Sequence, residues 1–135
     1  MSYAANAYAK TAQAAPTSQR ELEAQVLIRS AARLQAIKDH WDQRKDQLDA
    51  ALVINRKIWT ILVAAVADEE SKLPLEIKRN IVGLGIFIFN HTIALTALHD
   101  PDPNKLQVLI TINRQIASGL RVNPAEALPE PPQAA

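Results

Sequence analysis

The three histidines are the first side chains to examine for chemistry, because histidine serves as a metal ligand and as a proton carrier near neutral pH. They stand at His40, His91 and His99. His91 and His99 are eight residues apart, whereas two imidazoles meet on a helix when they are three or four residues apart. No pair therefore has the spacing of a helical metal site. His91 lies in an apolar segment and is predicted to be a hydrogen-bonded histidine of the core.

The remaining side chains show no catalytic pattern. The sequence has no cysteine, which excludes disulfides, thiolate nucleophiles and cysteine zinc sites. Gly83 and Gly85 stand within a predicted helix with no strand before them, so they do not form a phosphate-binding loop. We expect them to let another helix approach closely. The acidic run 68–70 is typical of a solvated loop. The sequence thus predicts a protein that is not an enzyme and uses no metal or cofactor.

Two asparagines fall on or beside apolar stripes. Asn55 is part of VINRKI and Asn113 is part of TINRQI. A buried amide must be hydrogen-bonded, so we interpret both as structural residues bonded to a neighbouring helix or loop. The alternative is that they bind the backbone of a partner segment.

Basic residues are balanced by acidic ones along the chain. The formal net charge is +1 and aromatic residues make up 4% of the sequence. A protein of this charge has no strong field to attract nucleic acid or a membrane surface, and it has few rings on which bases can stack. We expect the basic pairs to be solvated helix faces and any RNA contact to be modest or indirect.

The elements that must position these residues are helices. Only three glycines occur, and the stretch 18–73 contains neither glycine nor proline, which excludes an all-β fold. One apolar stripe of helical spacing precedes the polar stretch 38–47 and a second follows it. A chain of this size favours a bend there, with Asp39 or Asp42 capping the new helix, although one continuous helix over 18–67 stays open.

Two further helices follow. The first is expected over 75–98, with Pro74 in its first turn. The second is expected to begin with Asp102 as its cap and Pro103 as its first residue, and to end at a left-handed Gly119. The fold class is therefore all-α, a small four-helix bundle with short connections.

The chain ends are expected to lie outside this bundle. Residues 1–16 are alanine-rich and stop at a proline, so we interpret them as a short helical arm. The helical domain covers 17–121. Residues 122–135 hold four prolines and are expected to form a disordered tail.

The segment 77–98 is apolar on more than one side. Its two stripes are Ile77, Ile81, Leu84, Ile88, His91, Leu95 and Leu98, and Val82, Ile86, Phe89, Ile93 and Ala97. A membrane span over 81–98 is disfavoured because Asn90 and His91 lie in its middle. With no secretory signal pattern at the N-terminus, we expect a cytoplasmic protein. Part of this helix should then be covered by the N-terminal arm, by a second copy of the chain, or by an amphipathic helix of another protein.

Several motifs together resemble the FlaF family of flagellar biosynthesis regulators of alphaproteobacteria. The likeness covers roughly residues 2–120 and includes the opening SYAANAYA and the stretch 20–23. Its main motifs are NRKIWT (55–60), NIxxLGxF (80–87) and LIxINRxIAxGL (109–120).

The resemblance implies a cytoplasmic factor for flagellin synthesis and export that acts with the regulator FlbT. It implies a flagellin-specific secretion chaperone that shields the amphipathic helical ends of flagellin. The alternative is a post-transcriptional regulator that acts on flagellin mRNA directly or through FlbT. On the chaperone hypothesis, the residues of these motifs predicted to bind the partner are Asn55, Arg56, Trp59, Asn80, Leu84, Phe87, Asn113 and Arg114.

Overall fold

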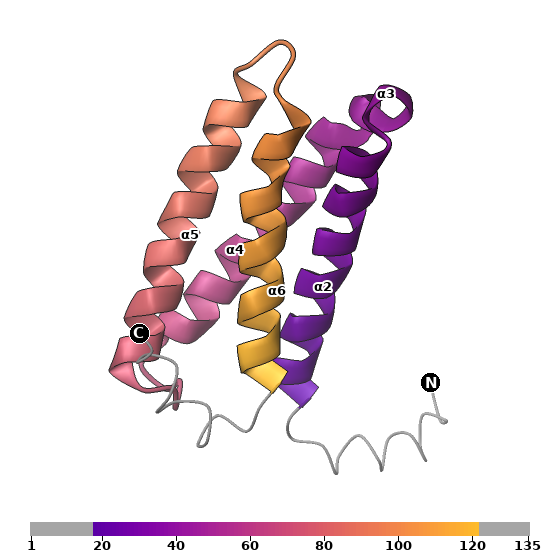
Figure 1. Cartoon of the computed structure of the whole chain (residues 1–135). Coiled ribbons are helices and arrows are strands. Elements are labelled where there is room, and N and C mark those ends of the chain that lie inside the picture. The colour runs from indigo at the N-terminus through magenta and orange to yellow at the C-terminus, as the bar shows by residue number, and fades with distance from the viewer. Residues whose placement is uncertain (1–17, 122–135) are drawn as a thin grey trace, which may run out of the picture.

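The computed structural model describes residues 18–121, and within them the fold is all-α, as predicted (Figure 1). The predicted arm and tail lie outside these residues. The elements are α2 (Ser18–Asp39), α3 (Trp41–Arg44), η2 (Lys45–Gln47), α4 (Leu48–Ala67), α5 (Leu75–Thr96), η3 (Pro103–Leu106) and α6 (Gln107–Arg121), of which η2 and η3 are 3₁₀ turns.

The four long helices form the predicted bundle. The helices α2 and α6, the first and last in the described sequence, pack along each other, and α4 passes behind them (Figure 1). α4 contacts α2 on one flank and α5 on the other. α5 touches α6 in few places, so α4 is the main support of α5.

The polar stretch 38–47 bends the chain, as predicted, but neither predicted cap forms. α2 ends at Asp39, and His40 leaves the helical conformation with φ −122° and ψ 49°. α3 begins after His40 and α4 after Gln47, and neither helix start has a side-chain cap. The expectation for Asp39 and Asp42 is therefore wrong. At the start of α3, the N–H of Arg44 makes the first helical bond to the carbonyl of His40 at 2.9 Å, and the N–H of Gln43, which a cap could serve, donates to the same carbonyl at 3.0 Å.

The turn before the last helix confirms the role of Asp102. Its carboxylate accepts a hydrogen bond from the backbone N–H of Asn104 at 2.9 Å, and Pro103 follows as the first residue of η3, which continues into α6. The expectation for Gly119 is wrong. It lies within α6, and no glycine among residues 18–121 has a positive φ. α6 runs on to Arg121, whose guanidinium pairs with Glu21 of α2 at 3.1 Å.

One of the two glycines in α5 permits the predicted close approach. A Cβ at Gly85 would lie 2.5 Å from Cγ2 of Val63 and 3.6 Å from the ring of Trp59, both on α4. A Cβ at Gly83 would meet nothing within 4 Å. Gly85 is therefore the point at which α5 is pressed against α4.

Among residues 18–121, length and composition alone would allow one helical stretch to cross a membrane, and this stretch is 41–67 rather than the segment 81–98 considered from the sequence. α4, which forms most of it, carries seven buried residues, among them Asn55 and Trp59. A core helix of a bundle can have the same composition, and these buried side chains place one face of α4 in the core.

Candidate partner-binding surface

The two asparagines lie together in the core rather than on a surface. Asn55 of α4, Asn113 of α6 and Trp59 of α4 are each 0% exposed. The Nδ2 group of Asn113 donates to Oδ1 of Asn55 at 2.7 Å and to the backbone carbonyl of Leu27 at 3.3 Å. Its Oδ1 accepts from Nε1 of Trp59 at 2.8 Å. Ser30 of α2 donates to Oδ1 of Asn55 at 2.8 Å.

This group of bonds, here called the asparagine network, joins three helices. It includes Leu27 and Ser30 of α2, Asn55 and Trp59 of α4, and Asn113 of α6. Buried polar groups without partners cost about 1–3 kcal/mol each, so displacing one helix along another would be unfavourable. The structural interpretation of the asparagines is confirmed.

The burial of the asparagine network contradicts the partner-binding prediction for three residues. Asn55, Trp59 and Asn113 have no exposed surface, so they offer no contact to a partner in the folded chain. Sequence reasoning assigned them to a surface because an apolar stripe looks the same whether it faces its own core or another protein.

The other five predicted residues do not form one surface. Asn80, Leu84 and Phe87 follow one stripe of α5, where Phe87 is 41% exposed and Leu84 is half-buried. Arg114 is exposed on α6, seven residues before Arg121, and so shares the side of α6 that faces α2. Arg56 is exposed on α4.

The histidine on the Phe87 stripe is held at both ends of its ring. The imidazole of His91 stacks on Phe87 with centroids 5.3 Å apart and an angle of 16° between the rings. Its Nε2 lies 2.9 Å from the backbone carbonyl of Lys105, so this nitrogen carries the proton and donates. The hydrogen bond predicted for His91 is present, although the side chain is half-buried rather than fully in the core.

An apolar depression that includes a predicted residue lies between α4 and α5. This α4–α5 groove encloses about 440 Å³ and is lined by Leu52, Val53, Arg56, Thr92, Ile93, Thr96 and Ala97. Val53 is 40% exposed and Ile93 is 64% exposed. Ile86, one of the stripe Val82–Ile86–Phe89–Ile93–Ala97, is also 55% exposed. The side chains of Val53, Ile86 and Ile93 thus leave apolar surface exposed to water, and the groove also contains the cation of Arg56.

Sequence reasoning found this stripe but did not assign it to the site. The stripe was visible as the second apolar face of the segment 77–98, whereas the predicted residues came from the family motifs. Of the eight predicted residues, only Arg56 lines the α4–α5 groove. The signal that would have found the groove is the excess of apolar residues over what four helices can cover.

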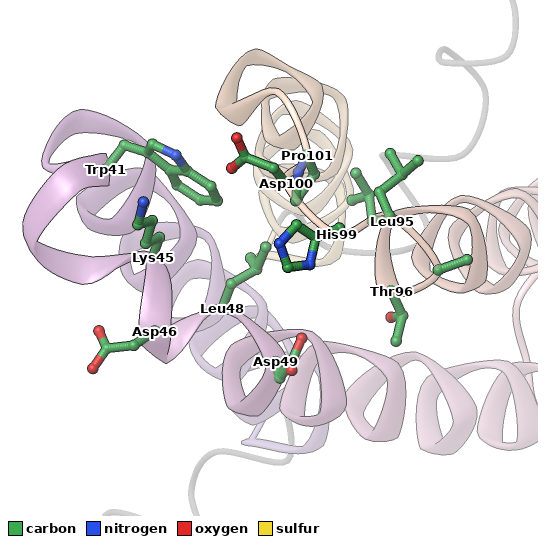
Figure 2. A pocket seen from close by; sticks show the side chains of 12 residues that line it. Trp41, Lys45, Asp46, Leu48, Asp49, Leu95, Thr96, His99, Asp100 and Pro101 are labelled. Atoms are coloured by element: carbon green, nitrogen blue, oxygen red, sulfur yellow. The ribbon is translucent and has the colours of Figure 1, made fainter.

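A polar hollow continues the α4–α5 groove at one end of the bundle (Figure 2). It encloses about 560 Å³ and shares Thr96 and Ala97 with the groove. The bend before α4 and the turn after α5 supply its walls, which include Trp41, Lys45, Asp46, Asp49, His99 and Asp100. In Figure 2 the ring of His99 lies near Leu48 and Leu95, while the carboxylates of Asp46 and Asp49 lie along the opposite rim.

The hollow has no arrangement that indicates metal binding. Within residues 18–121, no group of three or more histidine, cysteine, aspartate or glutamate side chains is placed to hold a metal ion. Because they share Thr96 and Ala97, the α4–α5 groove and the hollow form one surface that changes from an apolar to a polar lining along its length.

Comparison with known proteins links the chain to one family. Residues 4–120 match the sequence model of a family described as flagellar protein FlaF. The match includes α2 through Leu120 of α6, and thus nearly all of the described structure. No curated protein and no solved structure gives a significant match to the chain.

Proposed function

The chain belongs to the FlaF family of flagellar proteins, and we propose that it is a cytoplasmic flagellin-binding export chaperone whose α4–α5 groove receives an amphipathic helix of flagellin. The observation that supports this proposal most directly is the groove itself. It is apolar, it is open to water, and it lies on the helix whose apolarity exceeds the needs of the bundle.

The exposed apolar surface of α5 suits a helix of about three turns. It extends from Ile86 to Ala97, roughly 16 Å along a helix, and the α4–α5 groove lies at its end, at Ile93 and Ala97. A client helix that places apolar residues at positions i, i+4 and i+7 would bury Ile86, Ile93 and Val53. Arg56 on the rim offers a cation to an acidic residue on the polar side of that helix.

The biological need for such a groove follows from the chemistry of the client. The terminal helices of flagellin are unpaired before assembly, and exposed apolar surface of that kind promotes association. Covering the apolar face until export would prevent this association. FlbT remains a predicted partner in the same process.

The decisive experiment measures flagellin binding to the full chain by isothermal titration calorimetry. Ile93→Asp places a charge in the α4–α5 groove and is expected to weaken binding by about 2 kcal/mol, roughly thirtyfold, because Ile93 loses its apolar burial. The matched control is Ile61→Asp, since Ile61 is 68% exposed but lies on the other flank of α4. Flagellin without its helical ends is expected not to bind.

Equal loss with both variants, or unchanged binding with Ile93→Asp, would contradict the assignment of the groove. Helical circular dichroism verifies that each variant is folded. Phe87→Asp in the same series tests the remaining predicted residue with a large exposed ring. If the chain instead binds flagellin mRNA, its affinity must fall steeply as salt rises, because phosphate contacts release counterions.

A further inference from the structure

The other flank of α4 carries a second apolar depression. This α2–α4 groove encloses about 230 Å³ and is lined by Leu22, Glu23, Val26, Leu27, Ile58, Ile61 and Leu62. Leu22 is 55% exposed and Ile61 is 68% exposed. The carboxylate of Glu23 is occupied, because it accepts from Arg20 at 2.6 Å and from Gln19 at 2.8 Å. The groove therefore presents apolar surface.

We propose that residues 4–15 of the same chain bind the α2–α4 groove and so complete the bundle on this side. The proposal is independent of flagellin binding, which we place on the opposite flank of α4. Its first support is position. The groove begins at Leu22, one helical turn after Ser18, where the segment joins α2.

The second support is the proline that separates the segment from α2. Pro16 disfavours the helical conformation at Ala15, so we expect a break in the helix there rather than a straight extension of α2. A change of direction at this point can turn the segment back toward the groove. As a helix, residues 4–14 extend roughly 16 Å, which exceeds the roughly 6 Å between Ile58 and Leu62, the two ends of the groove along α4.

The third support is the pattern of the segment. Ala5, Tyr8 and Ala12 recur at intervals of three and four residues and would share one face of a helix. The two alanines permit a close approach to α2 and α4, and Tyr8 supplies one large ring for the depression between Val26 and Ile61.

The fourth support is the extent of the family match. The sequence common to the family begins at residue 4 and ends at residue 120, so it includes this segment and leaves out residues 122–135. The latter residues contain four prolines and two glutamates, a composition poorly suited to an apolar groove. The N-terminal segment is thus the occupant that the molecule favours.

Paramagnetic relaxation enhancement on the full chain tests the proposal. The chain has no cysteine, so Tyr8→Cys creates a single attachment site for a nitroxide label. We expect the backbone amide signals of Leu22, Val26 and Ile61 to lose intensity relative to the sample with the reduced label. The matched label at Ala127→Cys, in the C-terminal segment, is expected to leave these signals unchanged.

Two further samples make the result specific to the groove. Adding Ile61→Asp to the Tyr8→Cys chain is expected to restore the lost intensities, whereas Ile93→Asp, at a similarly exposed isoleucine in the α4–α5 groove, is expected to leave the loss in place. Mixing spin-labelled unenriched chain with unlabelled ¹⁵N-enriched chain distinguishes binding within one chain from binding between two copies.

Three results would overturn the proposal. The first is that the amide signals of the α2–α4 groove keep their intensity with the label at residue 8. The second is a loss of signal intensity confined to residues of α5. The third is a loss in the mixed sample as large as in the singly labelled chain, which would assign the groove to a second copy. Broadening by the label at residue 127 alone would assign it to the C-terminal segment. Because the label itself replaces Tyr8, Ala5→Cys repeats the measurement with the tyrosine present.

Discussion

The two flanks of α4 hold their neighbours by different means. Toward α2 and α6, the asparagine network imposes directional hydrogen bonds of 2.7–3.3 Å on fully buried groups. Toward α5, the contact is made by apolar side chains around Gly85. Within residues 18–121, each flank has one buried polar atom without a hydrogen-bond partner, Nδ2 of Asn55 in the network and the hydroxyl of Thr92 on the α5 side. Directional bonds specify one arrangement, whereas an apolar contact tolerates an additional apolar guest. The molecule therefore separates a hydrogen-bonded core from the apolar surface on which we propose that a helix binds.

The largest effect is expected from breaking the asparagine network. Asn113→Ala removes three hydrogen bonds and leaves the buried Nε1 group of Trp59 without its acceptor, while Oδ1 of Asn55 keeps only the bond from Ser30. We expect the free energy of unfolding to fall by about 3–5 kcal/mol, measured by urea denaturation. Asn90→Ala, at an exposed position of α5, is the control and should change stability by less than about 0.5 kcal/mol. Similar values for both variants would show that the network does not distinguish the two flanks.

The next effect concerns the close approach of α4 and α5. Gly85→Ala forces Val63 away from its present position and should destabilise the fold by about 1–3 kcal/mol. Gly83→Ala has open space and should stabilise the protein by about 0.5–1 kcal/mol, because alanine is the better helix former. Thermal denaturation of the two variants gives the comparison. Stabilisation by both substitutions would mean that α5 is free to move outward.

Thr92 offers a smaller change in the opposite direction. Its buried hydroxyl has no hydrogen-bond partner, so Thr92→Val should raise the free energy of unfolding by about 1 kcal/mol. Urea denaturation measures the difference. A loss of stability would indicate that the α4–α5 flank depends on a polar contact after all, for instance with an ordered water.

The smallest effect is expected at the exposed ion pair between the first and last helices. The hydrogen bond from Arg121 lowers the pKa of Glu21 below its ordinary value of 4.5. Because the folded-state pKa is the lower one, the pair stabilises the fold above the unfolded pKa, and this contribution is lost as the pH falls through the folded pKa. The stability difference between the wild type and Glu21→Gln should therefore shrink between pH 7 and pH 3. A difference that is the same at both values would contradict this coupling.

Much of the fold could be predicted from the sequence. The spacing of apolar residues gave four helices, and the polar stretch 38–47 gave the bend. Asp102 and Pro103 marked the start of the last helical segment because their side chains act locally. The errors at Asp39, Asp42 and Gly119 share one cause. Each assumed a local signal for a helix end, whereas the backbone bonds of the bend and the packing of α6 on α2 decided it.

The candidate site was harder to predict, because its residues are defined by what the other helices cover. Asn113 is buried by contacts with residues 58 and 86 positions away, and nothing near it in the sequence indicates them. Ile93 and Ile88 are both isoleucines of α5, yet one is 64% exposed and the other 0%. Their difference depends on the position of α4, which the spacing of apolar residues does not give.

The pairing of α2 with α6 also has a consequence for synthesis of the chain. The first described helix finds its main neighbour in the last one, and Glu21 meets Arg121 across 100 residues. A growing polypeptide therefore cannot complete its core until α6 has emerged from the ribosome. Until then, the apolar surface of its earlier helices stays exposed to water. We propose that this protein shields the unpaired helices of another chain, and its own helices are unpaired in the same way while it is being synthesised.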